Sequence, residues 1–326
     1  MALCGSLHLL LAPAATVALL LAVLFLVLRP RPVRIPIKGR HVFITGGSSG
    51  IGLALAKRVA AEGARVSILA RSLPKLEVAR EEIRRATGTE VTIYSADVRD
   101  EQAVKEAVEA AGEVDVLVCN QGVFLPRELA TQDLEEVKYT MDINVMGTFN
   151  LIRYALPGMK RGGEAAGPRS IAIVSSQAGQ VRDQCQKLKR KPEITAILAA
   201  SSTMMELEDL ITKTLDGIKS GTFLVTCNLE GIILSLSTAG GAPTRSPTAA
   251  LLEVAFAGFM RFIGLWVLSG WYVAIRKCHA KQKSKELMKV PMHEGKTQES
   301  TYRSSDDLLV PGLLLSFDNN IWIWEC

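Results

Sequence analysis

The sequence predicts an α/β fold in which a Rossmann-like, doubly wound parallel sheet carries helices on both faces. From residue 39 onward, short apolar runs alternate with amphipathic stretches of helical period, as in parallel sheets covered on both sides. The first run leads into the glycine-rich turn Thr45-Gly46-Gly47-Ser48-Ser49-Gly50-Ile51-Gly52. Such a turn between a strand and a helix is typical of a phosphate-binding loop. With 326 residues, 48% of them hydrophobic, the chain can bury one such domain.

Each element can be placed in chain order from the apolar runs and their boundaries. The five expected strands are residues 41–45, 65–70, 91–95, 114–119 and 170–175. The first helix should begin near Gly50 and stop before Gly63, and a long helix over 134–159 should break or bend around Gly147. A surface helix over 206–219 and a late strand over 222–228 are expected after the fifth strand.

Residues 7–28 are almost uninterruptedly apolar and long enough to cross a bilayer as a helix. They lack the basic start and the cleavage site of a signal peptide, so they predict a retained transmembrane anchor. The run Arg29-Pro30-Arg31-Pro32-Val33-Arg34 follows directly and places the main domain on the cytosolic side. A buried core helix is the alternative, but a helix this apolar on all sides would be unusual there.

Two further apolar stretches, residues 231–239 and 251–275, follow the domain. Because the basic residues after 276 should stay cytosolic, a hairpin or an in-plane helix fits better than one span. A core helix packed on the domain is the alternative. We therefore divide the chain into an anchor with its linker (1–38), a nucleotide-binding domain (39–229), a C-terminal membrane-associated region of apolar helices (230–289) and an unrelated tail that could be disordered (290–326).

Composition favours a membrane partner and gives no sign of nucleic acid. The formal net charge is +5, and the basic residues cluster beside apolar segments instead of forming a patterned face. The six cysteines are scattered with no Cys-x-x-Cys pair, and the four histidines are far apart in sequence. Neither a disulfide framework nor a metal site is predicted.

The glycine-rich turn is the predicted pyrophosphate cradle. Gly46 permits the tight turn, Gly50 lets the backbone approach the phosphates, and Gly52 lets the helix pack closely on the strand. The helix N-terminus adds free amides and positive dipole charge. An ordinary glycine turn is the alternative, which the strand before and the helix after make less favourable. The predicted contacts are Gly46, Ser48, Ser49, Gly50, Ile51 and Gly52.

Arg71 stands at the end of the second strand, where a carboxylate would bind the ribose 2′-hydroxyl of NAD. A guanidinium there could hold the 2′-phosphate of NADP, which favours NADPH as the cofactor. Lys75, four residues on, could join it. The alternative for both is a pair of solvated charges at a helix start.

Other predicted cofactor contacts follow the third and fourth strands. Asp97, with Val98 beside it, could accept a hydrogen bond from an adenine amino group. Asn120 and Gly122 lie in the turn that ends the fourth strand. Because ligands bind at the carboxyl ends of the strands in open α/β sheets, these residues should approach the cofactor.

Taken together, the motifs resemble the short-chain dehydrogenase/reductase family. They are Thr-Gly-x-x-x-Gly-x-Gly at 45–52, Asp97-Val98, the turn at 120–122, Asn144 before Val145-x-Gly147, and Ser175-Ser176 after a strand. Within that family the anchor, Gly-Gly-Ser-Ser-Gly, and residues 120–124 and 175–180 are similar to plant 3-ketodihydrosphingosine reductases. The resemblance covers about the first 180 residues and resumes over residues 187–285.

This resemblance implies reduction of a long-chain 3-keto sphingoid base by NADPH, in sphingolipid synthesis, at the cytosolic face of the endoplasmic reticulum membrane. The bilayer would be a partner, and homo-oligomerisation is left open. A reductase of another lipid, steroid or retinoid ketone is the alternative. The resemblance further implies that a serine orients the ketone, a tyrosine donates a proton, a lysine lowers the tyrosine pKa, and an asparagine holds a relay water. Asn144 and Ser176 fill two of these places, with Ser175 as the alternative serine.

The tyrosine and the lysine of that set are absent, because none of the five tyrosines has a lysine four residues later. The residues after Gln180 are similar to a part of the family from well beyond this motif. We therefore infer that one contiguous block is lost between Gln180 and Val181, through splicing or an error of gene prediction. The sheet should then be truncated after its fifth strand, with an unpaired edge and one uncovered face. The chain could be an impaired reductase, a membrane-attached NADPH-binding pseudoenzyme or a poorly folded product.

Overall fold

The computed structural model describes residues 33–125, 132–161, 167–175, 205–229, 247–287 and 321–325, with scattered residues between 15 and 26 and between 231 and 235. Most of the predicted anchor, the 180/181 junction and most of the apolar stretch 231–239 lie outside these residues.

The predicted parallel sheet is confirmed over five strands. They are β1 (His41–Thr45), β2 (Arg65–Ala70), β3 (Thr92–Ser95), β4 (Val116–Cys119) and β5 (Ser170–Val174). Their spatial order is β3-β2-β1-β4-β5, with every neighbouring pair parallel. The order reverses between β1 and β4, which is where open α/β sheets bind their ligands.

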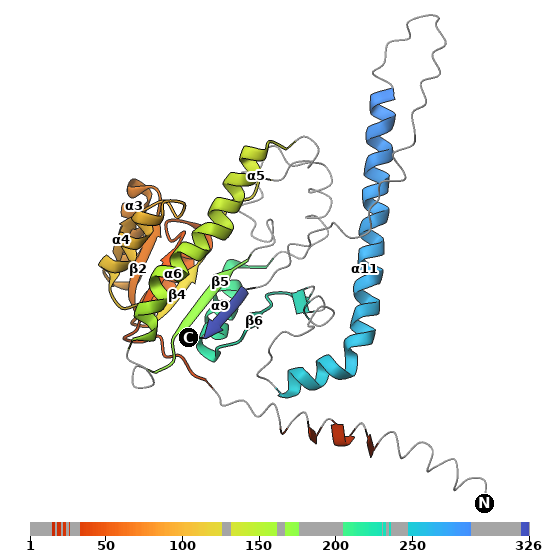
Figure 1. The fold of residues 1–326 in the computed structure, drawn as a ribbon, viewed down its shortest axis with the longest axis horizontal. Helices are drawn as coiled ribbons and strands as arrows, with labels where there is room; N and C mark the ends of the chain where they lie inside the picture. The colour runs from red at the N-terminus through yellow and green to blue at the C-terminus, as the bar shows by residue number, and fades with distance from the viewer. Residues whose placement is uncertain are drawn as a thin grey trace, which may run out of the picture.

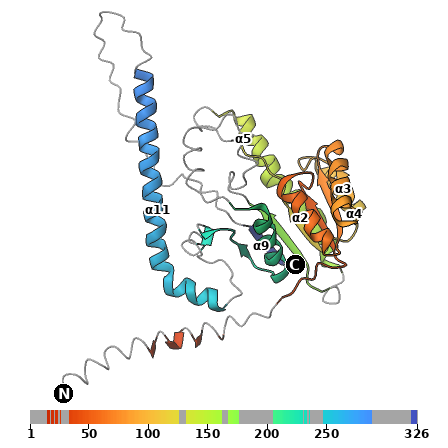
Figure 2. The same cartoon turned by 180° about the vertical axis from the view of Figure 1, so that it is seen from behind.

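Helices cover both faces of this sheet, as Figures 1 and 2 show from opposite sides. Because side chains alternate along a strand, Val42 and Ile44 of β1 join the core on one face, and Phe43 joins the core on the other. The first face is covered by α2 (Gly50–Ala61), α3 (Leu73–Thr87) and α9 (Leu207–Ser220). The second face is covered by α4 (Glu101–Ala111) and α6 (Gly147–Lys160).

The long helix expected over 134–159 is three consecutive segments. It comprises α5 (Leu134–Met141), a π-helical turn η2 (Asp142–Met146) and α6. The predicted irregularity is therefore present, and it ends at Met146, directly before Gly147. Single π-turns inside α-helices often occur at functional sites, and η2 contains Asn144.

The open edge predicted at β5 is not observed, and the sheet does not stop at its fifth strand. The C-terminal strand β7 (Ile321–Glu325) pairs antiparallel with β5 over its full length. On its other side β7 pairs with the two-residue strand β6 (Leu224–Val225), which completes the order β3-β2-β1-β4-β5-β7-β6. The prediction failed because strand pairing satisfies backbone groups whatever the origin of the segment that supplies them.

The C-terminal apolar stretch forms one helix, α11 (Pro247–Leu287), which continues through the basic residues after 275. In both views it stands apart from the sheet domain (Figures 1 and 2). Its side chains Phe259, Phe262 and Trp266 are exposed, which does not fit the alternative of a core helix. Among the described residues, no helix is both long and apolar enough to cross a bilayer.

Candidate functional site

The glycine-rich turn has the backbone conformation that a phosphate cradle needs. Gly46 and Gly50 have φ values of +64° and +57°, which favour glycine over other residues. Helix α2 begins at Gly50, and the side chain of its N-cap residue, Ser49, forms no capping hydrogen bond. No acidic residue lies in the first turn of α2. The first amides of the helix are therefore free of a side-chain cap and can bind an anion.

Gly52 makes the closest backbone approach in the turn. A Cβ at this position would lie 2.4 Å from the Gly46 carbonyl oxygen and 2.6 Å from Asn120 Nδ2. The Asn120 amide donates to the Thr45 carbonyl oxygen over 3.1 Å and so fastens the end of β4 to the turn. The tight turn, the uncapped helix N-terminus and the lack of a side chain at Gly46, Gly50 and Gly52 fit the pyrophosphate of a dinucleotide.

Thr45, which is not among the predicted site residues, ties the turn to β4. Its buried hydroxyl accepts hydrogen bonds from the backbone amides of Asn120 (3.0 Å) and Gln121 (3.3 Å). Gln121 in turn donates from Nε2 to the Thr148 hydroxyl on α6 over 2.8 Å. A polar residue in the last position of a buried strand is the signal that could have indicated this role.

Asn144 lies against the turn that follows β4. Its Oδ1 accepts from the Val123 amide and its Nδ2 donates to the Val123 carbonyl oxygen, each over 2.9 Å. A Cβ on Gly122 would lie 3.6 Å from Asn144 Oδ1. This reciprocal pair joins the π-helical turn to the exposed loop at the strand ends.

Val98 is buried and packs against Gly147, directly after the π-helical turn η2. A Cβ on Gly147 would lie 2.6 Å from Val98 Cγ2, so the helix can approach β3 this closely only with glycine there. Asn150 Nδ2 donates to the Val98 carbonyl oxygen over 3.1 Å. The structure therefore gives Val98 a packing role.

Arg71 is exposed at the carboxyl end of β2, and Lys75 is exposed in the first turn of α3. Arg71 Nη1 donates to the Tyr139 hydroxyl over 2.8 Å. Asp97 is bound by Arg99, whose Nε lies 3.1 Å from both carboxylate oxygens and whose Nη2 lies 2.7 Å from Oδ2. These hydrogen bonds hold the pKa of Asp97 below its usual value. Tyr139 and Arg99 were not among the predicted site residues, because neither lies in a motif.

Of the two candidate serines, Ser175 lies within the described residues and Ser176 does not. Ser175 follows β5 directly and is half-buried at the carboxyl edge of the sheet, on the same edge as Asn120. Ser176 lies outside the described residues. The site as described therefore unites the glycine-rich turn, Asn120, Asn144 and Ser175 at one edge, with Arg71 and Asp97 at the ends of the next strands.

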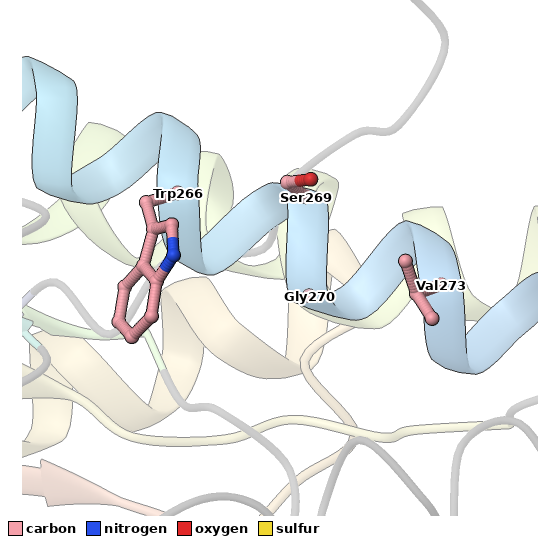
Figure 3. Close-up of a pocket in the computed structure, with 4 residues that line it drawn as sticks. All are labelled: Trp266, Ser269, Gly270 and Val273. Atoms are coloured by element: carbon pink, nitrogen blue, oxygen red, sulfur yellow. The ribbon is translucent and has the colours of Figure 1, made fainter.

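A separate depression lies on α11 and does not belong to this edge. It is lined by Trp266, Ser269, Gly270 and Val273, which lie along a single helix (Figure 3). None of the predicted site residues lines it.

Comparison with known proteins identifies relatives over most of the chain. Residues 40–187 match the family model described as short chain dehydrogenase. The chain is 48% identical to 3-dehydrosphinganine reductase TSC10A of Arabidopsis thaliana, over 77% of this chain and 90% of that protein. It is 44% identical to TSC10B of the same plant, over 81% of this chain and 92% of that protein. The mouse 3-ketodihydrosphingosine reductase is 27% identical, over 86% of this chain and 98% of that protein.

The number of aligned positions in a match exceeds the number of residues that this chain contributes, and the difference is the number of gaps in this chain. The match to TSC10A spans 295 positions, whereas 77% of 326 residues is about 251, so about 44 positions face gaps in this chain. A glucose 1-dehydrogenase of Gluconobacter oxydans matches 47% of the chain, about 153 residues, over 160 positions. The short match thus contains about 7 gap positions, far fewer than the match that spans most of the chain.

Proposed function

Because the chain belongs to the short-chain dehydrogenase/reductase family, we propose that it binds NADPH at the described edge of the sheet. The observation that carries this proposal is the glycine-rich turn with its uncapped helix, together with Arg71 at the end of β2. Family membership implies a nicotinamide cofactor. The choice of the phosphorylated form rests on the guanidinium of Arg71, which can bind a phosphate in two hydrogen bonds.

The substrate class that we propose is a long-chain 3-keto sphingoid base, reduced at the 3-keto group. The names of the relatives at 48% and 44% identity support it. When bound, the cofactor would supply the hydride. The residues of this chain would orient the ketone through Ser176 or Ser175 and hold a water through Asn144. Another lipid or steroid ketone is the alternative substrate.

We propose that this chain turns over poorly, because it lacks a Tyr-x-x-x-Lys pair to donate the proton. The roughly 44 gap positions that this chain shows in the match to TSC10A support the loss of an internal block. So does the surface of α6. Right-handed crossover would place a helix after β5 on the same face as α6. Phe149 of α6 and Met146, the last residue of η2, are 65% and 52% exposed and are large apolar side chains that such a helix could cover.

We further propose attachment to the endoplasmic reticulum membrane with the domain in the cytosol. Support comes from the apolar residues 7–28 with the basic run after them, and from the exposed apolar side chains of α11. Flotation of the full chain with phosphatidylcholine vesicles tests the attachment. Replacing both Phe262 and Trp266 by Glu should weaken it, and an unchanged floating fraction would contradict the part assigned to α11.

Binding and turnover are tested on the full chain in detergent. We expect NADPH to bind at least tenfold more tightly than NADH, and Arg71→Leu to abolish this preference. Arg80→Leu is the matched control, because Arg80 is a partly exposed arginine on α3 that pairs with Glu77. Equal affinity for both nucleotides in the folded wild-type chain would contradict the proposal.

Turnover of 3-ketosphinganine by the wild-type chain should not exceed that of Ser176→Ala. Turnover clearly above this variant would contradict the proposed impairment. Tight NADPH binding without turnover would favour a membrane-attached NADPH-binding pseudoenzyme. No binding, with rapid proteolysis, would indicate a poorly folded product.

A further inference from the structure

Tyr139 of α5 lies between two arginines that follow neighbouring strands. Its hydroxyl accepts a hydrogen bond from Arg71 Nη1 over 2.8 Å, at the end of β2. The guanidinium carbon of Arg99, which follows β3, lies 4.9 Å from the centroid of its ring. One half-buried side chain on a helix therefore contacts both cations at the adenosine end of the proposed site.

These contacts restrain side chains that would otherwise be mobile. An arginine side chain loses rotamer entropy when it is fixed, and an exposed arginine without a partner loses this entropy on binding its ligand. Arg71 is exposed, and Tyr139 uses one of its five N–H donors. The remaining donors are left to bind a phosphate, with part of the ordering already done in the free protein.

The second arginine removes an electrostatic obstacle. Asp97 lies at the end of β3, next to β2, and a bare carboxylate there would repel a phosphate dianion. Arg99 binds both oxygens of Asp97 and stacks on the Tyr139 ring. Asp142, a further acidic group near Arg99, is paired with Lys138. Asp97 and Asp142 are thus each paired with a cation.

We propose that Tyr139 is a positioning residue that holds Arg71 ready for a phosphomonoester on the adenosine ribose, and so sets the preference for NADPH over NADH. This inference rests on the proposed function, because it assumes a dinucleotide in the glycine-rich turn. It adds a residue of α5 to a preference otherwise assigned to Arg71 and Lys75. The ring of Tyr139 keeps Arg99 on Asp97, and its hydroxyl aims Arg71.

The test is Tyr139→Phe in the full chain, which deletes the acceptor for Arg71 and keeps the ring under Arg99. We expect the Kd for NADPH to rise about fivefold, as for the loss of a hydrogen bond to a charged group at an exposed site. The Kd for NADH should change by less than twofold. The matched control is Tyr154→Phe, since Tyr154 is another tyrosine whose hydroxyl bonds a charged group, Glu101, beside the arginine Arg153.

A double-mutant cycle separates positioning from a direct effect. In the Arg71→Leu background, Tyr139→Phe should cause no further loss of NADPH affinity. An equal loss for NADPH and NADH, or a loss that persists without Arg71, would overturn the inference. So would an unchanged preference in Tyr139→Phe when the wild type prefers NADPH. If the folded wild type shows no preference at all, the proposed function itself fails and this inference fails with it.

Discussion

At the scale of single residues, the site depends on close backbone approach. Gly52 has almost no room for a side chain, because the atoms it would meet are a backbone oxygen and the amide of Asn120. Asn120 is itself fixed by hydrogen bonds to Thr45. The motif predicted that Gly52 matters, but only the structure shows that its neighbours are the turn itself and the end of the adjacent strand β4.

Gly52→Ala should therefore weaken NADPH binding at least tenfold and destabilise the fold by about 1–3 kcal/mol, because the turn must move to accept the methyl group. Titration of NADPH fluorescence and urea unfolding measure the two effects. Gly258→Ala is the control, since a Cβ at Gly258 meets nothing within 4 Å. Wild-type affinity in Gly52→Ala would show that the cradle is not here.

His41 gives the domain a predictable response to acid. It is buried at the start of β1, where Nε2 lies 2.7 Å from Ser67 Oγ and Nδ1 lies 2.7 Å from the Glu113 carbonyl oxygen. Burial lowers the pKa of His41 below its ordinary value. The unfolded chain therefore takes up this proton first, from about pH 6.5 downward.

We expect the free energy of unfolding to be insensitive to His41 above about pH 7 and to fall as the pH drops below about 6.5, until the lower pKa of the folded state is reached. Urea unfolding between pH 5.5 and 7.5 measures this slope. His41→Gln should lower stability at all these pH values but flatten the slope. A slope equal to that of the wild type would assign the acid response to other groups.

At the scale of elements, the front of the domain was predictable and the end of the sheet was not. Strands β1 and β2 and helix α2 have the predicted bounds, because their apolar runs and the glycines around them act locally. Strand β7 was missed because its partner, the edge of β5, is more than 140 residues away in sequence. Pairing of this kind leaves no local signal.

Strand β7 should contribute to stability through its backbone on both sides. Ile323 faces Ala172 of β5 in the middle of the pairing. Ile323→Pro should remove a ladder hydrogen bond and so lower the free energy of unfolding. The apparent Tm should fall by about 2–4 °C for each kcal/mol of unfolding free energy that is lost. Ser304→Pro, in the same tail but outside β7, is the control. Equal Tm values and equal proteolysis for both variants would show that β7 does not hold the sheet edge.

At the scale of the whole molecule, the chain combines a Rossmann-like domain that carries the predicted cofactor site with the lack of a Tyr-x-x-x-Lys pair anywhere in the sequence. The site residues predicted from motifs in the first half lie at one edge of the sheet. Tyr139 and Arg99 could not be predicted, because their roles depend on contacts between α5 and the ends of β2 and β3. Long-range packing, not local pattern, brings them together.

Restoring the block should restore the reaction. We expect a chimera that carries the corresponding stretch of the Arabidopsis relative between Gln180 and Val181 to reduce 3-ketosphinganine with NADPH at least tenfold faster than the present chain. Oxidation of NADPH, followed by absorbance, measures it. The same chimera with the inserted tyrosine changed to Phe is the control. A chimera that folds and binds NADPH but stays inactive would contradict the proposed substrate.

The π-helical turn η2 has a geometric consequence for the helix that contains it. One extra residue in a helical turn rotates everything after it by about 100° relative to a regular α-helix. Asn144 can therefore clasp Val123 while Asn150 and Leu151, farther along, still face β3 and the core. Removing a single residue from this turn would put the two ends out of phase, so that only one could keep its partners.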